Sequence, residues 1–268
     1  FLLKNAVEVG GPTKVTLGSI AAGSTVGYSL PNASYDSVNF SVAGQDTSPR
    51  DVTFNNDGTK MYMVGATNDS VYQYSLSTAY DMSTASYDSV SFSVSGQDDF
   101  PNGVAFSNDG TKMYIVGDED PSESVYQYSL STAFDLSTAS YDSVSFSITS
   151  QDQNPRDLTF NSDGTKMYIM GNDTDSVYQY SLSTAFDLST ASYDSVSFSV
   201  SGQDTTVVSI AFNNDGSKMY ILGTVTDSVY QYTLSTAFDL STASYDSVSF
   251  SVSSEDSNPI GITFNATG

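Results

Sequence analysis

Two sets of residues recur in the chain at a fixed spacing, and each could form a binding site. The first set closes five loops of differing sequence, DTSPR, DDFPN, DQNPR, DTTVV and DSNPI. Because ligand sites often use variable loops held by a rigid scaffold, we expect these loops to line a binding face. The alternative is that loops drift while packing keeps repeated strands constant. The residues expected at the mouth of this face are Arg50, Asn102, Arg156, Val208 and Ile260.

The second set is one aspartate per repeat. Five carboxylates could converge on Ca²⁺, which takes six to eight oxygen ligands. The alternative is an Asp that starts a turn and bonds the backbone two residues further on. No Asp-x-Asp-x-Asp-Gly loop is present, so the sequence favours the turn and predicts neither a bound metal nor another cofactor. The weak calcium candidates are Asp46, Asp98, Asp152, Asp204 and Asp256.

The residue inventory excludes several kinds of chemistry. The chain has no Cys and no His, which rules out Ser-His-Asp and Cys-His catalysis and makes a zinc site very unlikely. Its net charge of −23 opposes binding to nucleic acid, which needs clustered Lys and Arg, and to an anionic membrane. No apolar run approaches the roughly 18 residues that span a bilayer.

A hydrolase with two catalytic carboxylates is the remaining catalytic possibility. A glycosidase places such a pair roughly 5 to 10 Å apart, and the pair must break the repeat. The glutamates are few, and the near identity of the repeats opposes a specialised pocket. The sequence therefore predicts that the chain is not an enzyme. The glutamates considered are Glu8, Glu119, Glu123 and Glu255.

The elements that position these residues follow from a repeat of about 52 residues, marked by FNNDGTKMYMVG at Phe54 and its near copies at Phe106, Phe160 and Phe212. Asn/Asp-Gly between apolar segments signals a hairpin. In the first repeat, RDVTF, TKMYMVG, SVYQYSL and YDSVSFSV read as strands, the last with Val and Phe alternating with Ser. Four antiparallel strands per repeat are typical of a β-propeller blade.

Both ends of the chain hold parts of one more repeat. Residues 13–42 contain matches to strands two (GPTKVTLG), three (STVGYSL) and four (YDSVNFSV), and residues 258–264 match strand one. Pairing the ends would remove exposed strand edges. We therefore predict an all-β, five-bladed propeller of four-stranded antiparallel blades, closed by its N- and C-terminal strands. The predicted parts are an N-terminal arm 1–12 and a propeller 13–268, with blades 49–94, 101–148, 154–200, 206–252 and a composite of 13–42 plus 258–268.

The hairpin FNNDGTKMYMVG resembles the strand–DG–strand signature of WD40-like and YVTN-type bacterial propellers. The longer unit VYQYSLSTAFDLSTASYDSVSFSV is similar to repeats of virion and surface proteins of marine phages and bacteria, and FLLKNAVEVGGPTKVTLG resembles the start of phage tail-fibre proteins. These resemblances imply a non-catalytic structural or adhesive module of a phage particle. Its implied location is the virion or the extracellular space, and its partner a host protein receptor, a glycan or a neighbouring virion subunit. The alternatives are a secreted bacterial adhesin and a carbohydrate hydrolase.

Overall fold

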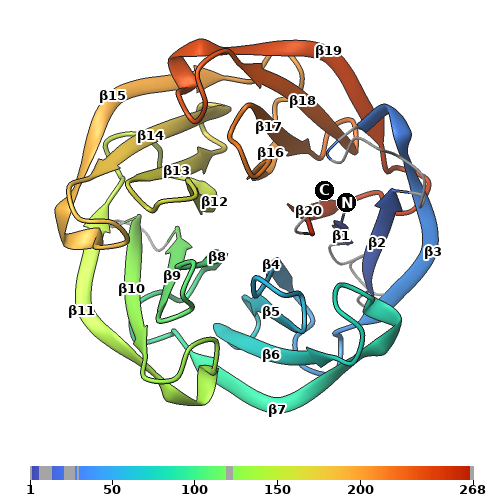
Figure 1. Cartoon of the computed structure of the whole chain (residues 1–268), viewed down its shortest axis with the longest axis vertical. Coiled ribbons are helices and arrows are strands. Elements are labelled where there is room, and N and C mark those ends of the chain that lie inside the picture. The colour runs from blue at the N-terminus through green and yellow to red at the C-terminus, as the bar shows by residue number, and fades with distance from the viewer. Residues whose placement is uncertain (1, 6–13, 21–27, 29, 119–122, 266–268) are drawn as a thin grey trace.

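Four four-stranded antiparallel sheets stand around a central axis in the computed structural model, which describes residues 2–5, 14–20, 28, 30–118 and 123–265 (Figure 1). Each sheet is one repeat, and its strands follow each other from the axis to the rim in chain order. The predicted all-β propeller of four-stranded antiparallel blades is therefore confirmed. The strands are β4 (Pro49–Phe54), β5 (Lys60–Gly65), β6 (Ser70–Leu76) and β7 (Ala85–Ser93); β8 (Pro101–Phe106), β9 (Lys112–Gly117), β10 (Ser124–Leu130) and β11 (Ala139–Ser147); β12 (Pro155–Phe160), β13 (Lys166–Gly171), β14 (Ser176–Leu182) and β15 (Ala191–Ser199); and β16 (Val207–Phe212), β17 (Lys218–Gly223), β18 (Ser228–Leu234) and β19 (Ala243–Ser251).

The remaining position in the ring holds two shorter sheets. Strand β20 (Pro259–Thr263) pairs antiparallel with β1 (Leu2–Asn5), and β2 (Lys14–Ile20) pairs antiparallel with β3 (Ala33–Ser41). Strands β1 and β2 lie side by side, but no ladder of hydrogen bonds joins their sheets within the described residues (Figure 1). The structure thus has four complete four-stranded blades, where the sequence predicted five.

The strand order at this position also differs from the predicted one. Residues 14–20 take the third place from the axis, as β2, and Leu2–Asn5 takes the second, inside the segment expected as an arm (Figure 1). Second and third strands carry the same alternation of apolar residues, so a short match cannot tell them apart. Residues 6–12 of the expected arm and 24–27 of the expected third strand lie outside the described residues.

The hairpin between the first two strands of each blade depends on glycine. Gly58 has a φ of 71°, a left-handed conformation that glycine adopts without strain. A Cβ atom there would lie 2.3 Å from the Tyr80 ring. Asp57 completes the turn by accepting a hydrogen bond from the Thr59 N–H at 2.9 Å. The Asn-Asp-Gly motif therefore forms the hairpin that the sequence predicts.

Apolar side chains on facing sheets bury each other between neighbouring blades. Tyr62 and Val64 of the first blade pack in one cluster with Val104, Met113 and Ile115 of the second, and all five side chains are fully or almost fully buried. Burial of each such side chain contributes about 1.5–3 kcal/mol. This packing between blades supplies the core that a single four-stranded sheet lacks.

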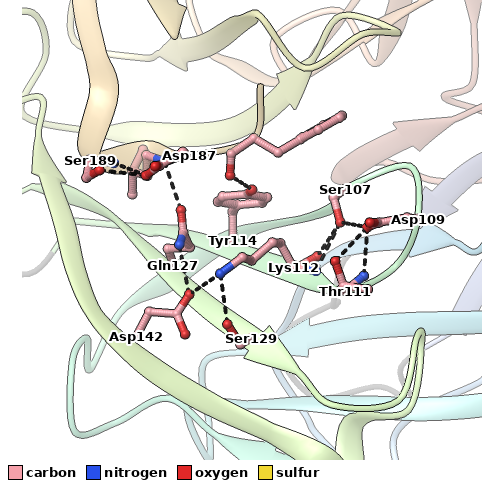
Figure 2. Close-up of polar contacts among 12 residues, drawn as sticks. Ser107, Asp109, Thr111, Lys112, Tyr114, Gln127, Ser129, Asp142, Asp187 and Ser189 are labelled. Carbon is pink, nitrogen blue, oxygen red and sulfur yellow. Dashed lines mark hydrogen bonds and ion pairs between the residues drawn. The ribbon is translucent and has the colours of Figure 1, made fainter. Parts of the chain in front are cut away.

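A polar network accompanies this packing (Figure 2). Lys112 Nζ lies 2.7 Å from Asp142 Oδ2, and Gln127 Nε2 donates to the same oxygen at 2.8 Å. Burial by itself would raise the pKa of Asp142, but the hydrogen bonds from Lys112, Ser129 and Gln127 outweigh it, and the pKa is lowered from 3.8. The same network recurs in every complete blade, with the lysine-bound aspartates Asp88, Asp142, Asp194 and Asp246.

The glutamine of this network also connects one blade to the next. Gln127 Oε1 accepts a hydrogen bond from the Leu188 N–H at 2.8 Å, at the start of a short 3-10 helix in the following blade (Leu188–Thr190). Gln73 and Gln179 make the equivalent bonds. Gln231 faces the incomplete fifth position, and its Oε1 has no partner among the described residues. The corresponding 3-10 helices are η1 (Leu30–Asn32), η2 (Met82–Thr84), η3 (Leu136–Thr138), η4 (Leu188–Thr190) and η5 (Leu240–Thr242).

In the described part of the chain, no helix has the length and apolar character needed to cross a membrane.

Candidate functional site

The innermost strands enclose a central cavity. Strands β4, β8, β12, β16 and β20 contact one another in that order, and β20 contacts β4 again, so the five strands form a closed ring (Figure 1). The cavity has a volume of about 460 Å³ and reaches from the middle of these strands to the Asp-Gly hairpins. The aromatic residues that line it include the five repeat phenylalanines, Phe54, Phe106, Phe160, Phe212 and Phe264.

Amide side chains join the hairpins at the end of this cavity. Asn56 Nδ2 donates to the Asn108 carbonyl oxygen at 2.5 Å, and Asn108 Nδ2 donates to the Ser162 carbonyl oxygen. Thr53 and Thr159 add hydroxyl groups to the wall. Phenyl rings, amides and hydroxyls together suit a small ring-shaped ligand that carries hydroxyl groups.

Two carboxylates interrupt the repeat on the cavity wall. Asp51 and Asp157 hold the same place on β4 and β12, where β8 and β20 have glycine and β16 has Ser209. Both carboxylates are largely buried, with 6% and 4% of the residue exposed. The catalytic carboxylates considered from the sequence were all glutamates, so these two aspartates were not among them. Comparison of RDVTF and RDLTF with NGVAF, VSIAF and IGITF identifies both aspartates as breaks in the repeat.

Both carboxylates connect neighbouring inner strands. Asp51 Oδ2 accepts a hydrogen bond from the Val104 N–H at 3.0 Å. Asp157 Oδ2 accepts one from the Ser209 hydroxyl at 2.5 Å and one from the Ile210 N–H at 2.9 Å. These donors hold the carboxylate oxygens in place between neighbouring inner strands. A carboxylate that lines a cavity can act there as a proton acceptor for water.

The five residues predicted at the mouth of the variable-loop face share one local geometry. The strand register shifts at each of these positions, so each residue is the extra one of a β-bulge near the start of an inner strand. A bulge re-aims the side chain that it carries. This mouth lies at the opposite end of the inner strands from the hairpins, and a ligand at Arg50, Asn102, Arg156, Val208 and Ile260 stays a prediction.

The predicted aspartate ring instead stabilises turns. Asp46 Oδ1 accepts hydrogen bonds from the Ser48 N–H at 2.7 Å and the Thr67 N–H at 3.3 Å, and its Oδ2 accepts one from the Asn68 N–H at 3.1 Å. Asp152 and Asp204 make the same contacts in their blades. The described residues contain no group of three or more Asp and Glu side chains placed to hold a metal ion. The turn accounts for this recurrence without a cation.

Comparison with known proteins places the chain in a family. The family model described as "Lactonase, 7-bladed beta-propeller" matches residues 26–190, more than half of the chain. The chain belongs to this lactonase family. Its four complete blades and incomplete fifth position are fewer than the seven in the family's description. No curated protein matches the chain in sequence.

Solved structures resemble this family member in fold. A putative 6-phosphogluconolactonase from Bacteroides fragilis is 14% identical with a TM-score of 0.52, over 92% of this chain and 66% of that one. The periplasmic gluconolactonase of Pseudomonas aeruginosa is 16% identical with a TM-score of 0.50, over 82% and 58%. A nidogen/laminin complex gives 10% and 0.54, over 97% and 95%. The chain thus spans about two thirds or less of the two lactonase structures.

These findings correct the predicted function. The sequence predicted a non-catalytic structural or adhesive phage module, and the family match contradicts both the phage module and the absence of enzymatic activity. The prediction failed because near-identical blades were taken to exclude a specialised pocket. The residues that break the repeat lie on the inner strands that line the central cavity.

Proposed function

We propose that the chain is a hydrolase that opens a lactone ring with water in the central cavity. The observation that carries this proposal is the family match over residues 26–190. The cavity of about 460 Å³ has the size of a small-molecule site. A sugar lactone of the gluconolactone type is the proposed substrate class, because similar structures bear gluconolactonase names and the wall offers hydroxyls and amides for a polyhydroxylated ring.

Asp51 and Asp157 are the proposed proton acceptors. In this reaction a carboxylate takes a proton from water, and the water oxygen bonds to the lactone carbonyl carbon. The bond from that carbon to the ring oxygen then breaks, and the ring oxygen takes up a proton. The product is a hydroxy acid, which releases one proton to solvent at neutral pH. Asp51 and Asp157 are the only acidic side chains among the residues described as lining this cavity.

The finer architecture also belongs to this proposal. We propose that β20, β1, β2 and β3 act as a fifth blade, because β1 pairs with β20, lies beside β2, and β2 pairs with β3. That arrangement supports the closed ring of inner strands that encloses the cavity. An extracellular location and a protein or glycan partner stay predictions.

The proposal is tested by proton release from glucono-1,5-lactone at neutral pH, measured above the spontaneous rate. We expect the wild-type protein to accelerate ring opening. We expect Asp51→Asn or Asp157→Asn to lower kcat by about 10²-fold or more if that carboxylate is the base. Asn keeps an oxygen that can accept the backbone hydrogen bond.

The matched control is Asp135→Asn, at the start of a 3-10 helix outside the cavity, where Asn also caps well. This variant should keep the wild-type rate. Equal rates in the wild type and in the Asp51→Asn, Asp157→Asn double variant, both folded, would remove the two carboxylates from the mechanism. No acceleration by the wild type with any sugar lactone would overturn the proposed function.

A further inference from the structure

The chain has only two arginines, and the fold places both at the end of the inner strands opposite the hairpins. Arg50 and Arg156 stand at the bulges of β4 and β12, and Asn102 stands at the same bulge of β8, the strand between them. Two cations meet here in a chain whose net charge is −23. Two arginines placed at random on an acidic surface would not be expected at the same end of the inner strands, because like charges repel.

The Nε donors of both guanidinium groups lack acceptors among the described residues. Among the described residues, neither forms an ion pair within 4.0 Å, and the Nε atoms of both are buried without a hydrogen-bond acceptor. The four lysines of the complete blades contrast with them, since each contacts an aspartate at 2.7 to 3.1 Å. A buried donor without an acceptor costs free energy.

Burial and the surrounding charges both act on the ionisation of Arg156. Burial lowers the pKa of Arg156 most, and the positive charge of Arg50 lowers it further, while Asp118, Asp173 and Asp152 oppose this effect from beyond ion-pair distance. Asn102 is buried and donates its amide to the Pro155 carbonyl oxygen at 2.9 Å, which fixes the strand next to Arg156. This end of the inner strands thus holds two arginines whose buried Nε donors have no acceptor among the described residues.

From this arrangement we infer that Arg50 and Arg156 form a binding site for a small oxyanion, a carboxylate or a phosphate. Guanidinium groups present parallel N–H donors that match two oxygens of such an anion. An anion between the two side chains supplies acceptors for the unpartnered donors and offsets the repulsion between them. The site lies at the end of the inner strands opposite the hairpins.

The test measures binding of inorganic phosphate and of malonate by isothermal titration calorimetry, at constant ionic strength set with sodium chloride. We expect saturable one-to-one binding by the wild-type protein. Arg50→Gln and Arg156→Gln should each weaken it about tenfold or more. Binding of both anions assigns the site to oxyanions in general, and binding of phosphate or malonate alone assigns it to that chemistry.

Two controls separate this role from a structural one. Ser91→Asp with Ser145→Asp changes the net charge by the same amount as both arginine substitutions, at exposed outer-strand positions, and should leave binding unchanged. Without anion, the arginine variants should unfold at the same temperature as the wild type or higher, because a repulsive pair has been removed. Binding that is absent in the wild type, or equally strong in the double arginine variant, would overturn the inference.

Discussion

The contribution of the hydrogen bond from Gln127 to the next blade can be measured, because Gln231 offers a control within the same chain. Gln127→Leu removes the bond to Asp142 and leaves the buried Leu188 N–H without an acceptor. Gln231→Leu removes the equivalent bond to Asp246, but no described residue donates to Gln231 Oε1. Leucine keeps most of the side-chain volume in both cases.

The magnitudes follow from these contacts. A hydrogen bond to a charged group contributes about 1.5–3 kcal/mol, and an unsatisfied buried N–H costs about 1–3 kcal/mol. We therefore expect Gln127→Leu to lower the free energy of unfolding by roughly 4 kcal/mol and Gln231→Leu by roughly 2 kcal/mol. At about 2–4 °C per kcal/mol, the difference is several degrees in Tm.

Urea unfolding followed by circular dichroism, together with a thermal scan, measures both variants against the wild type. Gln73→Leu should behave like Gln127→Leu, since Gln73 makes the same bond to Leu136. Equal losses in the Gln127 and Gln231 variants would refute the assignment of stabilisation to the bond between blades.

Two further predictions concern the hairpins and the lysine-bound aspartates. Gly58→Ala should destabilise the fold by about 1–3 kcal/mol, because its φ is 71° and the new Cβ would lie 2.3 Å from Tyr80, whereas Gly96→Ala, with open space around it, should change stability little in the same unfolding assay. The pKa of each lysine-bound aspartate is lowered from 3.8 in the fold, so its stabilisation is present above that pH and is lost as the pH falls through the lowered value. When the unfolding free energy is measured from pH 5 down to pH 2, it should therefore decrease once the pH is below about 4. The decrease should be smaller in Lys112→Met. An unfolding free energy of the wild type that does not change with pH would contradict the assigned contacts.

The repeated part of the fold could be predicted from sequence because each local signal agrees with the others. The Asn-Asp-Gly turn at Gly58 fixes a hairpin, and the alternation in YDSVSFSV fixes which residues face the next sheet. Because the chain has four near copies of this unit, each sheet can bury both of its faces by packing against its neighbours in a ring.

The ends of the chain and the site were harder to predict. Residues 14–20 resemble a second strand in their alternation but lie in the third place, because only tertiary pairing distinguishes the two. Asp51 and Asp157 are hidden inside strand segments, and no propensity separates a cavity-facing carboxylate from a turn residue. Comparison of the five inner-strand segments identifies the two aspartates as breaks in the repeat, but only the arrangement of the strands around one axis shows that they line a cavity.

The most direct test of the account is a crystal structure of the Asp51→Asn, Asp157→Asn double variant soaked with glucono-1,5-lactone. The account predicts density for the lactone, or for its hydroxy acid, in the central cavity, with the carbonyl carbon facing residues 51 and 157. Ligand density confined to the outer strands, or an unoccupied cavity at saturating lactone, would contradict it.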